Sequence, residues 1–356
     1  MFIYRLICER FNVKKVDRRS FLKTAACSAA ALGLANTNNN VMAMAAHSAK
    51  TNITNKNKSW SLIILPDTQH YAEKYPGFFH LQTQWILENK DKYNIAYVLQ
   101  TGDVTNNNIE IQWQRASQAF ARLDGKIPYA MALGNHDFGL KGKTQDRTTL
   151  ANNYFPVSRF EKMPTFGKPM ETGKIDNTFH TFKVLEQNYL ILCLEFGPRN
   201  EVLEWANQII TKHPNHKTII LTHAYMYYDS TRYDWLAKGK EQEWNPHKYP
   251  IGKSDTTTVN DGQEMWDKLV KKHSNVFMTV NGHVLNDGLG YLVSQGDNGN
   301  NVHQMLVNFQ MLPIGGDGWL RILNFQPDRK TIKVEDYSPF YEKFDTDPDN
   351  QFTITL

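Results

Sequence analysis

The stretch SLIILPDTQHY, residues 61–71, predicts how this chain is organised around a functional site. The apolar run at positions 62–65 is typical of a short strand that is buried on both faces. Pro66 ends the run and Asp67 follows it, so the strand delivers a carboxylate to its carboxyl end. Gln69 continues the polar turn. A carboxylate in this position is a candidate ligand, although an Asp after a strand is more often a turn former or a helix cap.

Strand and helix patterns alternate along the rest of the chain. We expect strands at 60–65, 95–100, 128–133, 179–184, 189–196, 217–223 and 275–283, and β-rich segments from 291 to the end. Apolar residues at helical spacing separate the first three strands, and further helices are expected near 200–212 and 262–272. Short βα connections favour parallel pairing with helices on the sheet faces. The predicted fold class is α/β, with two mixed sheets face to face and helices outside them.

The composition divides the chain into three parts. Residues 1–46 have the pattern of a twin-arginine-type signal peptide, and residues 47–58 are polar and predicted to form a disordered spacer. Residues 59–356 are expected to form one functional domain, with an aromatic-rich insertion near 225–260 and a β-rich C-terminal part. No break in composition within that domain indicates a second one.

The signal prediction depends on DRRSFLKTAACSAAALGLA, residues 17–35. Paired arginines precede Phe-Leu-Lys and a weakly apolar, alanine-rich stretch, which is the pattern of a twin-arginine signal. One alternative is a basic arm on a cytoplasmic protein. Another is a lipoprotein acylated at Cys27, which Thr24 disfavours because a lipobox has an aliphatic residue there. We therefore expect a periplasmic or otherwise exported protein, with the twin-arginine export machinery as a partner.

The charge balance agrees with this division. The chain has 40 Lys and Arg against 36 Asp and Glu, but residues 1–46 hold seven of the basic residues and two of the acidic ones. The remainder has a formal charge of −1, so we expect no specific nucleic-acid binding and no attraction to anionic membranes. We also expect no membrane span in the mature protein. Cys193 is the lone cysteine after the signal segment, which excludes an internal disulfide there.

Polar side chains follow five of the predicted strands. They are Asp67, Asp103 in TGDV, Asn135, His136 and Asp137 in GNHD, His223, and His283. Ligands bind at the carboxyl ends of the strands in α/β sheets, so these side chains are expected to meet. Each motif alone is weak, since a single histidine at a strand end is more often a satisfied structural residue. The ordered set of carboxylate, amide and imidazole donors predicts a site for Mn, Fe, Zn or Ni.

This series of motifs resembles that of the calcineurin-like metallophosphoesterases over residues 60–285. The resemblance implies a four-layer αββα sandwich that carries two divalent transition metal ions at its strand ends. It implies that Asp67, with Gln69 in place of the family's histidine, binds the first metal, and that Asp103 bridges both metals. The implied ligands of the second metal are Asn135, His223 and His283.

The resemblance also implies the catalytic groups. His136 would protonate the leaving-group oxygen or stabilise the transferring phosphoryl group, and Asp137 would orient His136. A metal-bound hydroxide would be the nucleophile. The GNHD element that supplies these two residues is complete in this chain.

Two departures from the family pattern fall on the same metal. The family's Asp-x-His is Asp-Thr-Gln here, ending at Gln69, and its terminal Gly-His-x-His ends at Leu285. An amide oxygen binds transition metals less well than imidazole does, and leucine offers no ligand atom. The first metal site is therefore expected to be weak, rebuilt or empty. Candidate replacement ligands are His70, Asp287 and His303, each of which could equally be an ordinary polar residue.

These observations favour a metal-dependent hydrolase of phosphate mono- or diesters that acts on a small-molecule or polymer substrate. The alternative is a non-catalytic or single-metal binding protein on the same fold. A more distant option is a carbohydrate- or cell-wall-associated scaffold.

Two further segments could contact the substrate. The insertion at 225–249 carries seven aromatic residues that could stack on a base or sugar, and Arg232 there could hold a phosphate. The insertion could equally pack its rings onto the sheet. The segment PIGGDGW, 313–319, could bind phosphate through backbone amides, although a hairpin turn is the simpler expectation.

Overall fold

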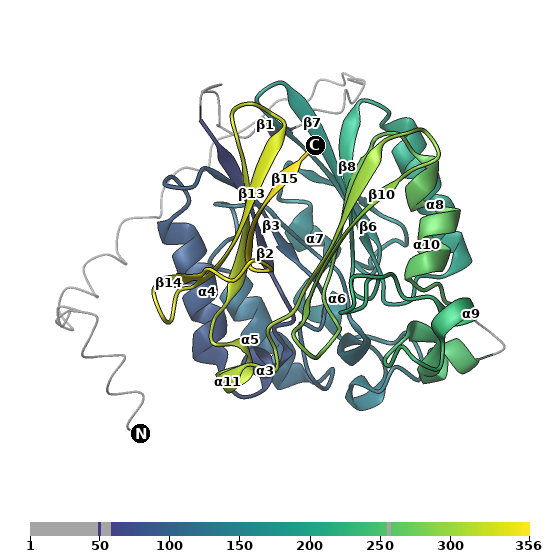
Figure 1. The fold of residues 1–356 in the computed structure, drawn as a ribbon. Helices are drawn as coiled ribbons and strands as arrows, with labels where there is room; N and C mark the ends of the chain where they lie inside the picture. The colour runs from purple at the N-terminus through teal and green to yellow at the C-terminus, as the bar shows by residue number, and fades with distance from the viewer. Residues whose placement is uncertain (1–48, 51–57, 255–257) are drawn as a thin grey trace, which may run out of the picture. The chain divides into compact units, whose positions relative to one another are not determined.

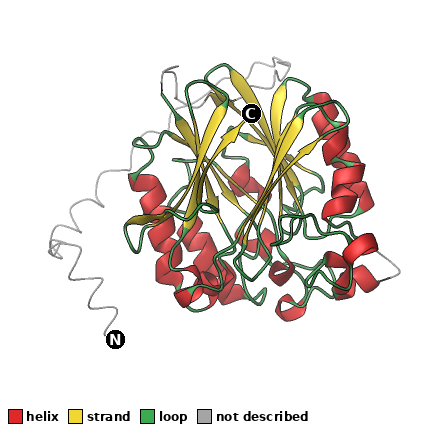
Figure 2. Cartoon of the chain, in the orientation of Figure 1, coloured by secondary structure: helices red, strands yellow, loops and turns green. Residues whose placement is uncertain are grey.

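Two mixed β-sheets lie face to face, and helices cover their outer faces (Figures 1 and 2). The computed structural model describes residues 49–50, 58–254 and 258–356, so the predicted signal segment lies outside the described part. The described residues belong to one unit, His47–Leu356. The predicted αββα arrangement of two mixed sheets is confirmed.

The two sheets differ in size. The larger has eight strands among the described residues, in the order β1 (Ala49–Lys50), β6 (Thr178–Val184), β7 (Gln187–Leu194), β8 (His216–Thr222), β9 (Val276–Asn281), β11 (Asn301–Val307) and β10 (Leu289–Gln295), with β5 (Phe166–Pro169) paired to β6. The smaller has seven, in the order β14 (Lys343–Asp345), β13 (Thr331–Ser338), β12 (Leu320–Phe325), β2 (Trp60–Leu65), β3 (Ile95–Gln100) and β4 (Tyr129–Met131), with β15 (Gln351–Thr355) paired to β13. Strands β2, β3 and β4 are parallel, and so are β7, β8, β9 and β11.

Helices flank each sheet. The α-helices are α3 (Gln69–Glu73), α4 (Pro76–Glu88), α5 (Glu110–Phe120), α6 (Ala151–Tyr154), α7 (Val157–Phe160), α8 (Asn200–Lys212), α9 (Trp235–Lys238), α10 (Gly262–Lys268) and α11 (Pro313–Gly316). The 3-10 turns are η1 (Asn135–Asp137), η2 (Leu140–Gly142), η3 (Pro246–Lys248), η4 (Pro250–Lys253) and η5 (Val270–Lys272). Helices α4 and α5 lie beside the smaller sheet, and α8 and α10 lie beside the larger one (Figure 1). In the part of the chain that is described, no helix combines the length and apolar character that a membrane span requires.

Strand β2 shows why the opening sequence is apolar without interruption. Leu62 and Ile64 face the core between the two sheets, whereas Ile63 and Leu65 face the core beneath the helices. Successive side chains of a strand point to opposite faces, so a strand between two cores needs an apolar residue at every position. This burial fixes the end of β2, and therefore the position of Asp67.

Two segments differ from the expectations. Segment 313–319 is not a hairpin turn, because β11 and β12 belong to different sheets and the segment connects them through α11. Within the predicted disordered spacer, Ala49–Lys50 form a short strand that pairs with β6. Residues 51–57 lie outside the described part. The strands expected at 179–184 and 189–196 correspond to β6 and β7, which form an antiparallel pair.

Candidate metal centre

The carboxyl ends of the parallel strands place the predicted ligands in one buried pocket. A ligand atom from each of Asp103, His223 and His283 lies within 4.8 Å of the other two. These residues follow β3, β8 and β9, which belong to both sheets. The centre therefore forms where the two sheets meet at their strand ends. All three residues of this cluster are buried.

The backbone around the cluster is strained and closely packed. Asp103 and His283 both have positive φ angles, of 49° and 79°, which few residues other than glycine adopt. A Cβ atom added at Gly134 would lie 2.1 Å from the Asp103 carboxylate. Only glycine therefore allows the GNHD turn to approach the predicted bridging ligand this closely. Strain of this kind is typical of functional sites.

Backbone carbonyls orient both imidazole rings. His223 Nδ1 lies 2.9 Å from the Thr101 carbonyl oxygen, and His283 Nε2 lies 2.8 Å from the Trp244 carbonyl oxygen. Each of these nitrogens donates a hydrogen bond to the carbonyl oxygen, because a carbonyl oxygen can only accept one. The other nitrogen of each ring, Nε2 of His223 and Nδ1 of His283, is then the unprotonated one in the neutral state. Such carbonyl partners are what metal-ligating histidines commonly have.

An amide oxygen completes this donor set. The Asn135 side chain is buried, and its Oδ1 has no hydrogen-bond partner among the described residues. A buried polar atom without a partner is costly unless something absent from the chain itself satisfies it. One carboxylate, one amide oxygen and two imidazoles fit a single divalent transition metal ion. We call Asp103, Asn135, His223 and His283 the second-metal half.

The electrostatics of the cluster favour a bound cation. Burial alone would lower the pKa of His223, but the Asp103 and Asp67 carboxylates raise it to about 9. Burial, followed by the charge of His223, lowers the pKa of His283 to about 3. Burial together with the charge of Asp103 raises the pKa of Asp67 to about 7, against the opposing effect of His223. Two buried carboxylates thus compete for positive charge that the protein supplies mainly through one imidazolium.

The other side of the pocket, which we call the first-metal half, consists of Asp67, Gln69 and Leu285. The Asp67 carboxylate accepts hydrogen bonds from the Thr101 hydroxyl (3.3 Å) and from the His283 backbone amide (2.8 Å). Gln69 Nε2 donates to Asp103 Oδ2 over 3.1 Å, while Gln69 Oε1 has no partner among the described residues. Leu285 is half-buried and offers no ligand atom. Hydrogen bonds therefore link Asp67 and Gln69 to Thr101, His283 and Asp103.

None of the three candidate replacement ligands belongs to the cluster of Asp103, His223 and His283, and each has other surroundings in the described structure. His70 lies on α3, 3.6 Å from Glu73. Asp287 is exposed and its carboxylate accepts the Leu289 amide. His303 pairs with Met278 in the middle of β9 and contacts the hydroxyl of Tyr291 at 2.7 Å. This pairing places His303 beside the middle of β9, whereas His283 follows the end of that strand.

The GNHD turn lies against Asp103. The backbone amide of His136 donates to Asp103 Oδ1 over 2.9 Å. His136 Nδ1 lies 2.8 Å from the Asn106 carbonyl oxygen, so Nδ1 donates a hydrogen bond to this oxygen. The other ring nitrogen, Nε2, is then the one that can contact a substrate. The Asp137 carboxylate instead accepts the backbone amides of Val104, Thr105 and Gly134. The prediction that Asp137 orients the His136 ring is therefore wrong, because this carboxylate fastens the two ligand loops to each other.

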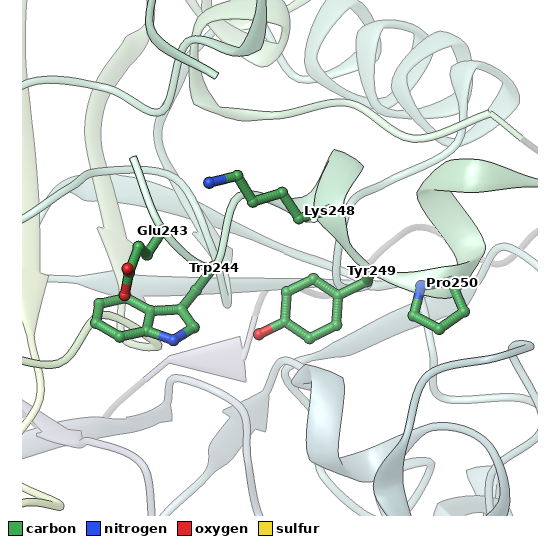
Figure 3. Close-up of a pocket in the computed structure, with 5 residues that line it drawn as sticks. All are labelled: Glu243, Trp244, Lys248, Tyr249 and Pro250. Atoms are coloured by element: carbon green, nitrogen blue, oxygen red, sulfur yellow. The ribbon is translucent and has the colours of Figure 1, made fainter. Parts of the chain in front are cut away.

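The insertion at 225–249 serves two purposes. Tyr225, Tyr227 and Tyr233 are buried, so part of the insertion packs its rings, as the second of the two equal alternatives expected. Arg232 stacks on the Trp266 ring at 4.5 Å and its guanidinium hydrogen-bonds Gln263, Ser294 and Gln304. The suggestion that Arg232 holds a phosphate is therefore wrong. The end of the insertion instead lines a pocket of about 470 Å³ (Figure 3).

Sequence reasoning missed three residues that act through their backbone. The carbonyls of Thr101, Asn106 and Trp244 hold the rings of His223, His136 and His283. A backbone carbonyl has no residue-specific signature, so nothing in the sequence pattern indicates these contacts. Of the three, only Thr101 could have been suspected, since it directly precedes Gly102 and Asp103.

Comparisons with known proteins agree with this geometry. A family model described as calcineurin-like phosphoesterase matches residues 61–284, more than half of the chain. The chain is 30% identical over 313 residues to an uncharacterised protein of Bacillus subtilis (strain 168), YvnB. That match covers 83% of this chain but only 22% of the relative, so the chain spans about a fifth of the length of the relative it matches.

Solved structures with a similar chain course include three enzymes. A purple acid phosphatase from yellow lupin seeds has a TM-score of 0.49 and 17% identity, over 84% of this chain and 54% of that one. The NAD nucleotidase of Haemophilus influenzae has a TM-score of 0.42 and 13% identity, over 83% and 50%. A 5'-nucleotidase precursor from Thermus thermophilus has a TM-score of 0.41 and 13% identity, over 84% and 54%.

Proposed function

This chain belongs to the calcineurin-like phosphoesterases, a family of phosphoric ester hydrolases, and we propose that it hydrolyses phosphate mono- or diesters with the help of one tightly held divalent transition metal ion. The ion would be held by the second-metal half. A second ion, if present, would bind more weakly at the first-metal half, where Gln69 replaces an imidazole and Leu285 offers nothing.

One observation carries this proposal: ligand atoms of two buried histidines and one buried carboxylate cluster within 4.8 Å of one another, and Asn135 of the adjacent GNHD turn has a buried amide oxygen without a partner among the described residues. Carbonyls of Thr101 and Trp244 hold the rings in these tautomers before any ion binds. Asp103 and His283 also have positive φ angles, so the backbone at both ligands is in a conformation that few non-glycine residues adopt. A bound divalent ion would supply positive charge for the phosphoryl oxygens and for water activation.

The remaining chemistry falls to His136. Its Nδ1 proton is committed to the Asn106 carbonyl, and its backbone amide is committed to Asp103. The ring is half-buried, so Nε2 can face a bound ester. Protonated at Nε2, His136 would donate a proton to the leaving-group oxygen or a hydrogen bond to the phosphoryl group. Asp137 would act indirectly, by holding the loops of Asp103 and His136 at a fixed separation.

A second candidate function has a specific observation in its favour. The hydrogen bond from Gln69 Nε2 to Asp103 Oδ2 occupies the oxygen through which Asp103 would reach a first metal. A phosphate-binding protein with one ion and no turnover would tolerate that arrangement. The intact GNHD turn favours hydrolysis over this alternative.

The two functions are separated by measuring metal content and hydrolysis on the same protein. Purified mature protein would be loaded with Mn, Fe, Zn or Ni and assayed with 4-nitrophenyl phosphate and bis(4-nitrophenyl) phosphate. Hydrolysis that disappears in Asp103→Asn and survives in Asp287→Asn, a matched change of an exposed carboxylate, supports the phosphoesterase. A bound ion without hydrolysis of either ester would support the binding protein instead.

We also propose export by the twin-arginine route, on the basis of the paired arginines Arg18 and Arg19. These residues lie outside the described part of the chain. Replacing both by lysine should keep the precursor in the cytoplasm. Secretion that is unchanged in this variant would exclude the twin-arginine route.

A further inference from the structure

The end of the insertion forms a pocket next to the metal centre. Glu243, Trp244, Lys248, Tyr249 and Pro250 line it, and we call it the Trp244 pocket (Figure 3). Its volume of about 470 Å³ lies within the range of small-molecule sites. Trp244, Lys248 and Tyr249 are half-buried, so their side chains are held by the fold yet reach the pocket surface.

The pocket adjoins the second-metal half directly. The Tyr249 ring lies 5.9 Å from the His283 ring and 4.9 Å from the Phe196 ring. The carbonyl of Trp244 is the partner of His283 Nε2. The Trp244 pocket therefore lies beside His283 of the second-metal half.

The functional groups of the pocket are not used by the fold. Among the described residues, no hydrogen bond or ion pair engages the Lys248 ammonium, the Glu243 carboxylate or the Tyr249 hydroxyl. The charges of Glu243 and Lys248 do not neutralise each other through a contact either. Trp244 has a φ of 61°, so the chain adopts a strained backbone where it presents the indole ring. In contrast, Tyr225, Tyr227 and Tyr233 of the same insertion are buried in packing.

Two aromatic rings, one cation and one carboxylate suit a ligand that is flat, partly anionic and rimmed with polar groups. Aromatic side chains stack on any nucleobase, since each base has a π-face. Lys248 can donate a hydrogen bond to an acceptor on the edge of the base, and Glu243 can accept a hydrogen bond from an amino group there. Arg232, which the sequence suggested for this task, is committed to Trp266 and its neighbours.

We propose that the Trp244 pocket binds the base of a nucleoside phosphate whose phosphate lies at the metal centre. This inference rests on the proposed phosphoesterase function only for the position of the phosphate. It makes Trp244, Tyr249 and Lys248 specificity-determining residues. The pocket would prefer a phosphate monoester that carries a base over one that has the same reacting bond and no base.

The test compares adenosine 5'-phosphate with ribose 5-phosphate. Both are esters of a primary ribose alcohol, so their leaving groups have similar reactivity and they differ in the base. We expect a higher kcat/KM for adenosine 5'-phosphate, and a loss of that preference by about 5- to 100-fold in Trp244→Ala, as base stacking on an aromatic residue predicts. Trp244→Phe should retain most of the preference. Trp235→Ala, which removes an indole from the same insertion but outside the pocket, should leave the preference unchanged.

A binding measurement makes the test independent of turnover. Adenosine has no phosphate, so its binding to the wild-type protein can be measured by calorimetry whether or not the protein hydrolyses esters. Binding that is lost in Trp244→Ala and kept in Trp235→Ala supports the pocket even if no ester is hydrolysed, in which case only the phosphoesterase proposal fails. If 4-nitrophenyl phosphate is hydrolysed but adenosine does not bind and no preference for the base exists, the pocket proposal is overturned and the phosphoesterase proposal stands.

Discussion

The two halves of the metal centre are built from the same strand ends but differ in what satisfies their polar atoms. In the second-metal half, a backbone carbonyl accepts a hydrogen bond from one nitrogen of each imidazole. His223 Nε2 and Asn135 Oδ1 have no hydrogen-bond partner among the described residues and are therefore available to a metal ion. In the first-metal half, the Asp67 carboxylate accepts hydrogen bonds from Thr101 and His283, and Gln69 Nε2 donates to Asp103, so Gln69 Oε1 is the side-chain oxygen left without a partner among the described residues. The second-metal half therefore offers more ligand atoms to an ion than the first-metal half, whose polar groups already take part in hydrogen bonds within the protein.

Whether a residue can ligate a metal therefore depends on the hydrogen-bond partners of its atoms as well as on its residue type. Asp67 is an intact family residue, yet its carboxylate acts here as a link between the β2 loop and the backbone of His283. Buried polar atoms are nearly always paired, so an unpaired one such as Asn135 Oδ1 is more informative than a paired carboxylate.

The largest effect is expected for His223→Ala, which removes a ligand of the second-metal half. The contribution of a catalytic ion is several kcal/mol, so kcat/KM should fall by about 1,000-fold or more, and the bound ion should be lost. The measurement is ester hydrolysis together with metal analysis of the same sample. His216→Ala is a matched control, because it removes an imidazole from the opposite end of β8. If His223→Ala retained its ion, the second-metal half would be assigned wrongly.

His136→Ala should lower kcat by about 100-fold or more, as loss of a general acid does. The bound ion should be retained, because the side chain of His136 is not among the clustered ligands. Metal analysis and steady-state kinetics therefore give different answers for this variant than for His223→Ala. His70→Ala, a nearby histidine outside the cluster, should change neither quantity. Equal loss of metal in both active-site variants would count against the separate role of His136.

Gly134→Ala should lower metal affinity by about 10- to 100-fold, as a displaced ligand does. The added methyl would lie 2.1 Å from Asp103 Oδ1, so the carboxylate or the GNHD turn has to move. Overpacking of this kind also destabilises the fold by about 1–3 kcal/mol. The comparison variant is Gly77→Ala, where nothing lies within 4 Å of the new atom. Metal titration and thermal unfolding of both variants would show whether the close approach matters.

The double variant Gln69→His with Leu285→His is expected to change activity least. It is also the most specific test of the first-metal half. It restores both imidazoles that the family pattern has at these positions and removes the hydrogen bond from Gln69 to Asp103. Bound metal should rise from about one to about two ions per chain. Leu285→His alone serves as the control, since Gln69 still holds Asp103 there. A double variant that still binds one ion would show that more than these two side chains closes this half.

Most of the fold and the second-metal half could be predicted from the sequence, because both follow from local patterns. Continuous apolar runs indicate strands between two cores, and the residue after each run has to lie at the strand end, as Asp103 and His223 do. Whether the candidate ligand His303 lies near the strand ends depends on the register between β11 and β9, which the sequence does not specify. The hairpin turn expected at 313–319 was wrong for a similar reason, because this segment connects strands of different sheets, and the sequence does not specify which sheet a strand joins.

Side-chain partners were harder to predict than strand ends. Asp137 was expected to contact the adjacent imidazole, but three backbone amides converge on its carboxylate. Arg232 was expected at the substrate, but the fold uses its guanidinium over Trp266. In both cases the residue type was compatible with either role, and the choice was made by tertiary packing that no local pattern records.

We predict that the second-metal half holds one ion without help from the first-metal half. The most direct test is the metal content of wild type, Gln69→Ala and Asn135→Ala after equilibration with limiting metal and removal of free ions. We predict about one ion per chain in the wild type, the same content in Gln69→Ala, and a marked loss in Asn135→Ala. Two tightly bound ions in the wild type, or loss of the ion in Gln69→Ala with retention in Asn135→Ala, would contradict the account.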